Sequence, residues 1–228
     1  MDPAAVWVTI PAYNEEAIIA SVVDPLSKLG FQVVVVDDCS DDQTVARLAE
    51  LPVHFLSHPV NLGQGAALQT AISYALSQQA RYIVTFDADG QHSPTDISKL
   101  LDPLIRGEFD VALGSRFIAG GSAENIPPIR RSMLRLAILL SRFSTGMKLT
   151  DTHNGLRAFT ADAARKLKIT QNRMAHASQI LSQISSQKLR YVEVPVRIVY
   201  TDYSMQKGQR VSNAFNVVWE SLMAFFHL

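Results

Sequence analysis

Short apolar runs alternate with amphipathic segments along the first half of the chain. The apolar runs are rich in β-branched residues and therefore predict strands. They span residues 6–10, 31–36, 53–56, 82–86 and 109–113. Apolar positions three or four residues apart predict helices at 16–29, after Asp42, at 66–76 and at 94–105. Because alternating strands and helices are joined by right-handed crossovers, the pattern predicts an α/β fold with a mostly parallel sheet.

The second half of the chain is less regular. We expect a loop at 120–128, a basic amphipathic helix at 130–143, and strands at 155–159 and 191–196. The remaining segments are a helix at 175–186, a polar segment at 201–208 and a last amphipathic helix at 211–228. The apolar run at 214–226 is too short and too polar to span a bilayer, so we expect it to pack on the core or lie in a membrane interface.

Composition limits the class of protein. The 228 residues are 47% hydrophobic, enough to bury a core. Lysine plus arginine number 21 and aspartate plus glutamate number 21, which argues against a nucleic-acid binder. The single cysteine, Cys39, excludes a disulfide scaffold and a cysteine metal cage. No signal segment and no run of about 18 apolar residues occurs, so we expect a soluble or surface-attached protein.

The zero net charge hides an asymmetry between the two halves. Residues 1–115 carry 5 basic and 15 acidic side chains, whereas residues 116–228 carry 16 basic and 6 acidic ones. Acidic clusters can hold cations, and basic clusters can hold phosphates or anionic lipid. Three polar clusters, at residues 11–15, 37–42 and 87–92, follow predicted parallel strands. Ligands of such sheets bind beyond the carboxyl ends of the strands, so the sequence predicts a site there.

The segment 87–92 (DADGQH) carries the most specific chemistry. Asp87 and Asp89 are two residues apart, and paired carboxylates at a strand end suit Mg²⁺ or Mn²⁺. Gly90 allows a turn that brings Gln91 or His92 back toward the ion. An acidic turn that caps the next helix is the alternative. An aspartyl-nucleophile phosphatase is disfavoured, because its carboxylates belong on the first strand and this pair follows the fourth.

The segment 37–42 (DDCSDD) offers a carboxylate to a nucleobase N–H, and Asp38 is the candidate for that role. Ser40 or Asp42 is expected to cap the next helix, and Cys39 to be a small packed side chain. The glycine turn at 61–67 could present N–H groups to a phosphate, although plain turn chemistry is the favoured explanation.

Arginines follow in the basic half. Arg116 comes directly after the fifth predicted strand, where it could bind a diphosphate. Arg130 and Arg131 begin a helix on which Arg135 and Arg142 follow. Because a helix N-terminus disfavours cations, a bound anion is one explanation, and a solvated face is the other.

Four of these motifs, in this order, resemble the family-two inverting glycosyltransferases of GT-A fold. They are residues 11–15 (PAYNE), 36–40 (VDDCS), 87–92 (DADGQH) and 114–117 (GSRF). The likeness is greatest to the dolichyl- and polyprenyl-phosphate sugar synthases and covers about residues 6–208. It implies a Rossmann-like sheet with a smaller acceptor-side region. The implied catalytic domain is 1–208, with a nucleotide-sugar half at 1–115 and an acceptor half at 116–208, followed by an amphipathic helix at 209–228.

The resemblance also implies roles for individual residues. Pro11, Tyr13, Glu15 and Asp38 would hold the nucleoside, with Asp87 beside them. Asp87, Asp89 and Gln91 would bind a divalent metal, Mn²⁺ or Mg²⁺. Arg116, Arg130 and Arg131 would bind phosphate, and Ser204 and Lys207 resemble the serine–lysine pair of an acceptor loop. The partners implied are a UDP- or GDP-sugar, a polyprenyl phosphate and the cytoplasmic surface of a membrane, with a small membrane protein as a further candidate.

Three positions depart from the family pattern. Gln64 stands where lysine is frequent, Gln179 where glutamate is frequent, and Thr201 where a phosphate-binding arginine is expected, so that Arg197, Lys207 or Arg210 would have to compensate. Two alternatives therefore stay open. One is transfer to a sugar hydroxyl, with Asp151 or His176 as the base that such an acceptor needs. The other is a non-catalytic nucleotide-sugar-binding subunit of a membrane complex.

Overall fold

The computed structural model describes residues 2–124, 128–171, 175–201 and 203–204, without the side chains of 128–131 and 133. Its centre is a seven-stranded sheet in the order β3-β2-β1-β4-β7-β5-β8. The strands are β1 (Val6–Ala12), β2 (Gln32–Asp37), β3 (His54–Ser57), β4 (Tyr82–Thr85), β5 (Val111–Ser115), β7 (Arg157–Thr160) and β8 (Tyr191–Pro195). Only β7 runs antiparallel to its neighbours, β4 and β5. The predicted α/β class and mostly parallel sheet are confirmed.

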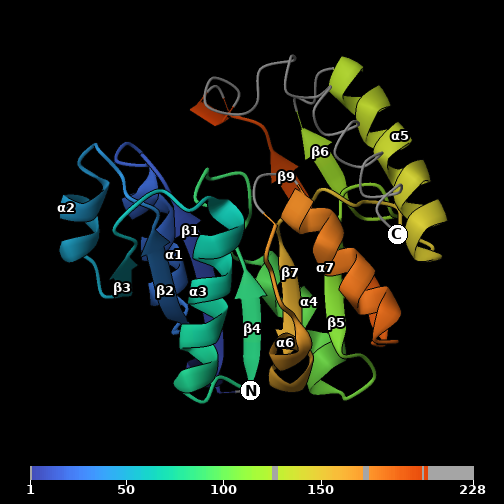
Figure 1. Cartoon of the computed structure of the whole chain (residues 1–228), viewed down its shortest axis with the longest axis horizontal. Helices are drawn as coiled ribbons and strands as arrows, with labels where there is room; N and C mark the ends of the chain where they lie inside the picture. Colours follow the sequence, from blue (N-terminus) through green and yellow to red (C-terminus); the bar gives the residue numbers. More distant parts are fainter. Residues whose placement is uncertain (1, 125–127, 172–174, 202, 205–228) are drawn as a thin grey trace.

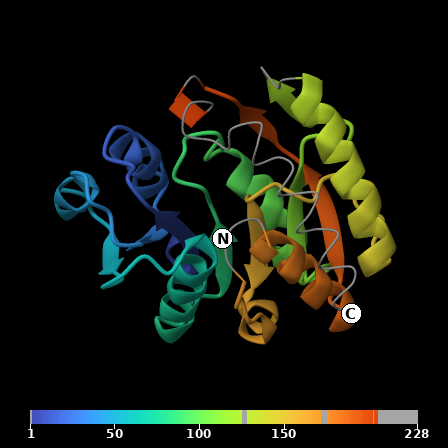
Figure 2. The ribbon, with the colours of Figure 1, turned by 45° about the horizontal axis from the view of Figure 1, so that its top comes forward.

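Helices cover both faces of this sheet (Figure 1). On one face lie α1 (Ile19–Lys28) and α4 (Asp96–Ile105), and on the other lie α3 (Gln64–Ser77), α6 (Ala161–Lys166) and α7 (Ala175–Ser186). At opposite flanks stand α2 (Thr44–Ala49) and α5 (Pro128–Thr145), as two views agree (Figures 1 and 2). A 3-10 turn, η1 (Pro3–Ala5), precedes β1. Within the described residues, no helix combines the length and the apolar character needed to cross a bilayer.

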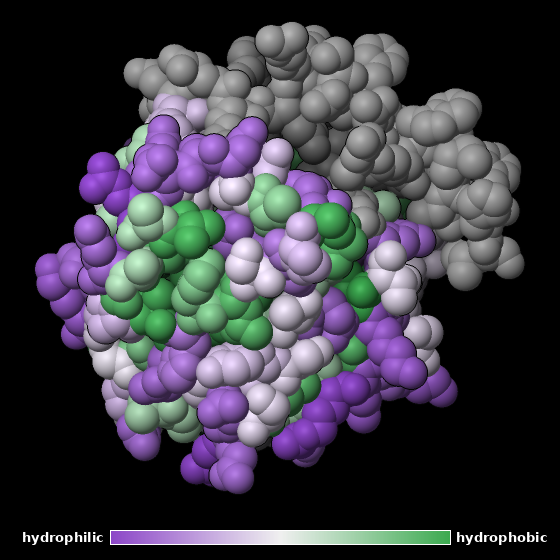
Figure 3. Space-filling view, turned by 60° about the vertical axis from the view of Figure 1, so that its left-hand side comes forward, coloured by the Kyte–Doolittle hydropathy of each residue, from purple (hydrophilic) through white to green (hydrophobic). Residues whose placement is uncertain are grey.

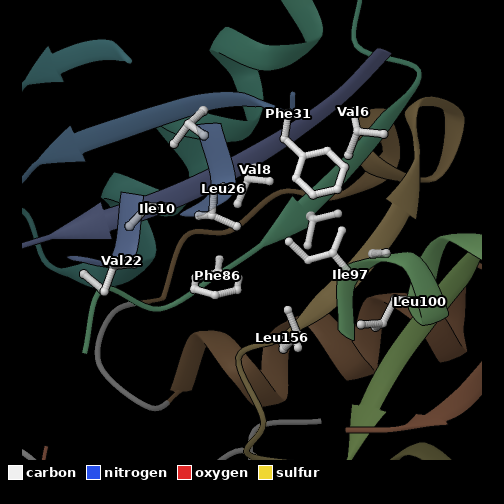
Figure 4. Close-up of a cluster of buried hydrophobic side chains, with 14 of the residues drawn as sticks. Val6, Val8, Ile10, Val22, Leu26, Phe31, Phe86, Ile97, Leu100 and Leu156 are labelled. Carbon is white, nitrogen blue, oxygen red and sulfur yellow. The ribbon is translucent and has the colours of Figure 1, made fainter. Parts of the chain in front are cut away.

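Strand side chains alternate between two separate cores. Val6, Val8 and Ile10 of β1 face α1 and α4, together with Phe86 and Leu156 (Figure 4). The other core contains Trp7, Val34 and Val36 with the apolar faces of α3, α6 and α7. Every residue of β1 is buried, which explains why this strand has no polar face.

The outer edge of the sheet is β3, whose side chains alternate between half-buried and exposed. The flank of the molecule that carries β3 and α2 shows apolar residues among polar ones (Figure 3). The exposed Phe55 of β3 belongs to this flank. The strand is only four residues long, and short edge strands limit unwanted pairing.

The predicted loop at 120–128 is partly wrong. Residues Ser122–Glu124 form strand β6, which pairs in parallel with β9 (Arg197–Val199) in a small second sheet. The Gly- and Ser-rich local sequence has no strand signal, because the pairing partner is far away in the chain. The pattern also missed the short helix α6, which the Thr160 side chain caps at the Ala163 N–H. The predicted helix at 211–228 lies outside the described residues.

Candidate nucleotide and metal site

A cleft of about 510 Å³ lies at the carboxyl edge of the sheet, beyond β1, β2 and β4. Its walls contain eight residues that the sequence singles out: Pro11, Tyr13, Glu15, Asp38, Asp87, Asp89, Gln91 and Arg116. Three further residues were expected at the site. Lys207 and the side chains of Arg130 and Arg131 lie outside the described residues. The cleft walls also include His92, from the same loop as Asp87, and His153, Asn154 and Gly155, from one further loop.

Asp87 follows β4 and is held from three sides. Its Oδ2 accepts a hydrogen bond from His92 Nε2 at 2.9 Å, and its Oδ1 accepts one from Gln64 Nε2 at 3.3 Å. Gly155 packs so closely that a Cβ atom there would lie 2.1 Å from Asp87 Oδ2. Burial opposes the carboxylate, but the hydrogen bond and charge of His92 outweigh it and lower the pKa of Asp87. Asp87 is therefore an ionised group.

The turn at Gly90 brings both Gln91 and His92 back to the carboxylates, as the glycine predicts. Gly90 has a φ of +72°, which favours glycine. Gln91 donates to Asp89 from its backbone N–H at 3.1 Å and from Nε2 at 2.8 Å. Burial, and then the charge of Asp87, raise the pKa of Asp89 to about 6. A cation between the two carboxylates would relieve this repulsion.

Among the described residues, no group of three or more His, Cys, Asp or Glu side chains forms a preformed metal cage. Mg²⁺ does not require one, because it is commonly bound by one or two carboxylates together with substrate phosphates and water. The oxygen atoms of Asp87, Asp89 and Gln91 form such a donor set in one cleft. The residues present therefore fit a hard divalent cation.

Asp38 follows β2, and its carboxylate is fixed by three donors. Its Oδ1 accepts from His58 Nδ1 at 2.8 Å and from the Leu62 N–H at 2.9 Å, and its Oδ2 accepts from the Gly63 N–H at 2.6 Å. The amides of the 61–67 turn therefore face a carboxylate and not a phosphate. Plain turn chemistry is the correct interpretation of that turn.

The neighbouring Cys39 is exposed, so the expectation of a packed side chain is wrong. Cys39 has a φ of +66°, and the next residue, Ser40, donates its backbone N–H to Asp37 Oδ2. This tight turn directs the Cys39 side chain outward. The N-cap residue of α2, Gln43, makes no side-chain capping bond. Asp42 instead accepts from the Thr44 N–H at 2.8 Å.

The loop after β1 is tied to the loop after β2. Asn14 donates its N–H to Ser40 Oγ at 2.8 Å, and its Oδ1 accepts from the Asp41 N–H at 3.0 Å. Glu15 is buried, and its Oε2 accepts from the Tyr203 hydroxyl at 2.7 Å. This side of the cleft, where the resemblance would place the nucleoside, is thus built from two loops that support one another.

Arg116 forms a buried bidentate ion pair with Asp151. Its Nε and Nη2 each lie 2.6 Å from a carboxylate oxygen of Asp151, and its Nη1 donates to the Tyr200 hydroxyl. Burial opposes the charge of Arg116, but the attraction and hydrogen bonds of Asp151 outweigh it and raise the pKa of the guanidinium. Asp151 is therefore a counter-ion, which does not suit the general base considered for a hydroxyl acceptor.

The inner end of the cleft is lined by the 153–155 loop, Arg157 and His176. Arg157 is buried and donates to the carbonyl oxygens of Asn154, Thr152 and Ala177. Burial lowers the pKa of Arg157 to about 10 and that of His153 to about 4, so at neutral pH the first is charged and the second neutral. The sequence predicted a strand at 155–159 and named Asp151 and His176 as candidate bases, but nothing in it marked Arg157 as a charge beside Asp87.

The three departures from the family pattern have definite contacts. Gln64 hydrogen-bonds Asp87, as described above. Gln179 Oε1 accepts from the N–H groups of Thr170 and Gln171, so this side chain supports a loop. Thr201 Oγ1 accepts from the Ser204 N–H, and Ser204 is buried with its hydroxyl on the Thr201 backbone. Arg197 is paired with Glu124 at 2.7 Å, and Lys207 and Arg210 lie outside the described residues.

The sheet and the acidic cleft define an α/β protein with a candidate site at the carboxyl edge of its sheet, and comparison with known proteins gives the family. The family model described as Glycosyl transferase family 2 matches residues 7–168. The chain belongs to this family and is a glycosyltransferase.

Two relatives match nearly the whole chain. An uncharacterized protein of Methanocaldococcus jannaschii is 34% identical, over 96% of this chain and 91% of its own. The UDP-N-acetylglucosamine–dolichyl-phosphate N-acetylglucosaminyltransferase of Methanococcus voltae is 33% identical, over 96% of this chain and 95% of its own.

A solved structure shares the fold. Glucosyl-3-phosphoglycerate synthase of Mycobacterium tuberculosis, crystallised with Mn²⁺, UDP and phosphoglyceric acid, superimposes with a TM-score of 0.69 at 19% identity. The match covers 95% of this chain and 78% of that one. The GT-A fold expected from the motifs is confirmed.

Replacing Gly155 with alanine should lower the rate of glycosyl transfer about 100-fold, because the new Cβ must displace the Asp87 carboxylate by about an ångström. Transfer rate and thermal unfolding are measured together. Gly107→Ala is the control, since nothing lies within 4 Å of its Cβ position and only its positive φ adds about 1 kcal/mol of strain. Equal rates for Gly155→Ala and wild type would contradict the proposed packing.

Replacing Asp151 with alanine should lower the free energy of unfolding by about 3–5 kcal/mol, because Arg116 is left buried without a counter-ion. Urea denaturation measures the change. Asp162→Ala, which breaks the exposed pair with Arg165, should cost less than about 1 kcal/mol. If Asp151→Ala keeps full stability and loses only turnover, the residue is a base and the ion-pair interpretation fails.

Proposed function

We propose that the chain is a metal-dependent inverting glycosyltransferase that moves a sugar from a UDP- or GDP-sugar to a polyprenyl or dolichyl phosphate. One observation carries the proposal. Arg116 lines the cleft that contains Asp87, Asp89 and Asp38, and it also lines a second groove along α5. A donor site and an acceptor site thus meet at one buried cation. The name of the Methanococcus voltae relative, which includes a dolichyl phosphate, supports this acceptor class.

The donor side is assigned by hydrogen-bonding chemistry. Asp38 and Glu15 are acceptors that suit the N–H groups of a base and the hydroxyls of a ribose. Pro11, near the end of β1, and Tyr13, in the loop after it, line the same cleft. A divalent cation held by Asp87, Asp89 and Gln91 would neutralise charge on the diphosphate and on the leaving group.

The second groove, of about 590 Å³, suits an acceptor that is anionic at one end and apolar along its length. Arg116, Arg135 and Arg142 line it together with Phe117, Ile118, Ile138 and Leu139. The arginines would bind the phosphate, and the apolar side chains would contact the first isoprene units. Arg130 and Arg131 are proposed to extend this cationic surface, and Lys207 to contact the phosphate from the acceptor loop.

The reaction needs no strong base. An oxygen of the acceptor phosphate attacks the anomeric carbon of the sugar, the bond from that carbon to the diphosphate breaks, and the configuration inverts. The attacking oxygen is already anionic, so no proton has to be removed. Arg116, fixed by Asp151 and Tyr200, would donate its remaining N–H groups to the diphosphate without having to reorganise.

The outer face of α5 suits a membrane surface. Leu136, Leu139 and Phe143, at helical spacing, are 46%, 54% and 78% exposed, while Leu134 and Ala137 on the inner face are buried. Arg135 and Arg142 flank the apolar stripe. An apolar stripe beside basic residues is typical of a helix that lies in a bilayer interface. We therefore propose peripheral attachment at a cytoplasmic membrane face, through α5.

Transfer to a sugar hydroxyl is the second candidate, and one observation favours it. His176, an imidazole that could act as a base, lines the inner end of the cleft together with Asp87. A hydroxyl acceptor would have to reach that inner end, whereas a lipid phosphate approaches from the α5 groove.

With Mn²⁺, a short polyprenyl phosphate and a panel of UDP- and GDP-sugars, the chain should yield a glycosylated lipid phosphate, detected by mass spectrometry. Asp89→Ala should reduce the rate at least about 100-fold, because charge on the leaving group is no longer neutralised. Nucleotide binding without lipid product would refute the lipid-phosphate acceptor. A product on a sugar hydroxyl that is lost in His176→Ala would establish the second candidate.

Replacing both Leu139 and Phe143 with serine should weaken binding to phosphatidylglycerol vesicles about tenfold, because apolar area is lost from the proposed contact face. Vesicle co-sedimentation measures the change. Val45→Ser on α2, which is exposed at the opposite flank, is the control and should bind as wild type does. Unchanged binding of the double variant would refute docking through α5.

A further inference from the structure

A partly buried chain of hydrogen-bonded side chains, Asp38–His58–Thr70, lies behind the proposed nucleoside end of the cleft. His58, directly after β3, places its Nδ1 2.8 Å from Asp38 Oδ1 and its Nε2 2.9 Å from Thr70 Oγ1 on α3. The His58 side chain is only 10% exposed and that of Asp38 only 4%. Asp38 lines the cleft. The Asp38 carboxylate therefore faces a ligand in the cleft, whereas the Thr70 hydroxyl does not.

The chemistry of the carboxylate fixes the proton arrangement. An ionised carboxylate can only accept a hydrogen bond, so His58 Nδ1 must carry a proton and donate a hydrogen bond to Asp38. This holds whether His58 is neutral or doubly protonated. In the neutral form Nε2 is an acceptor, and the Thr70 hydroxyl is the group that donates to it. Thr70 thus favours the tautomer that Asp38 requires.

The orientation of Asp38 is set from both sides. Within the described residues, His58 and the N–H groups of Leu62 and Gly63 occupy three of about four acceptor positions of the carboxylate. The position that remains for a ligand is again an acceptor. A matching ligand must therefore offer a hydrogen-bond donor. In a nucleobase, the imide of uracil or the amide and amino groups of guanine supply one as an N–H.

We propose that His58, oriented by Thr70, is a positioning residue that fixes Asp38 to receive an N–H of the donor nucleobase. The inference rests on the proposed function, because it takes the ligand of Asp38 to be a nucleobase. His58 holds the base-reading carboxylate as His92 holds the diphosphate-side carboxylate, Asp87, at 2.9 Å. The two buried histidines thus support opposite ends of one donor site.

Calorimetric titration of the full chain with UDP and GDP, in the presence of Mn²⁺, tests the assignment. His58→Leu should weaken binding of the preferred nucleotide about 10- to 100-fold. His58→Asn, whose Nδ2–H₂ can replace the Nδ1–H donor, should recover most of the affinity. Thr70→Val should lose affinity severalfold, and Thr70→Ser, which keeps the hydroxyl, should not. In transfer assays the donor KM should rise while kcat stays within about twofold.

A matched control separates positioning from simple stability. His54, at the start of the same strand β3, pairs with Tyr74 at 3.0 Å and packs against the Trp7 ring, and it is not among the residues that line the cleft. His54→Leu should lower the melting temperature and leave nucleotide affinity unchanged. If His58→Leu does the same, His58 is structural and the inference fails.

Two further results decide cases in which His58→Leu does not fold. Long-range ¹H–¹⁵N spectra of the wild-type chain should show a proton on His58 Nδ1, and a ring protonated only on Nε2 would overturn the inference. Equal nucleotide affinity for Thr70→Val, Thr70→Ser and wild type would overturn the role of Thr70. If the wild-type chain binds neither nucleotide, the proposed function itself fails, and the assignment fails with it.

Discussion

Negative charge gathered at one edge of the sheet is the constraint on which the rest of the site depends. The neighbouring parallel strands β2, β1 and β4 end side by side and direct acidic loops into one cleft. Burial and the charge of Asp87 raise the pKa of Asp89 to about 6. Carboxylates this close in a desolvated site stay ionised only when donors and cations surround them. The other loops of the cleft supply those groups.

The antiparallel strand β7 and the loop before it supply groups that surround this negative charge. By running between β4 and β5 in the reverse direction, β7 brings the start of its own segment to the acidic edge. Gly155 then fits against the Asp87 carboxylate, and Arg157 adds a buried charge nearby. Asp151, in the loop before β7, pairs with Arg116 inside the basic half of the chain. Arg157 is the residue through which the basic half compensates the acidic half in this site.

The sequence predicted the groups at strand ends and missed the groups that hold them. The period of the hydrophobic pattern and the position after a predicted strand singled out Asp38, Asp87, Asp89 and Arg116, because both properties are local in the sequence. The strand β6 was missed because it exists only through pairing with β9. His58 and Asp151 contact Asp38 and Arg116 across long stretches of chain. The local spacing of residues cannot predict such contacts. Long-range contacts make Arg116 a paired charge, and they direct amides of the turn at 61–67 to a carboxylate.

Gln64 shows how one of these distant contacts shapes the chemistry. A lysine at this position would place a full charge beside Asp87, whereas the amide of Gln64 contributes a hydrogen bond to Oδ1 at 3.3 Å and no charge. His153, on the opposite wall, is neutral at ordinary pH because burial lowers its pKa to about 4. The described residues whose charges lower the pKa of Asp87 are Arg157 and two histidines. Of these, Arg157 is the fixed cation. The charge of Asp87 and Asp89 together exceeds that of one arginine, which suits the divalent cation that we propose to bind here with the diphosphate.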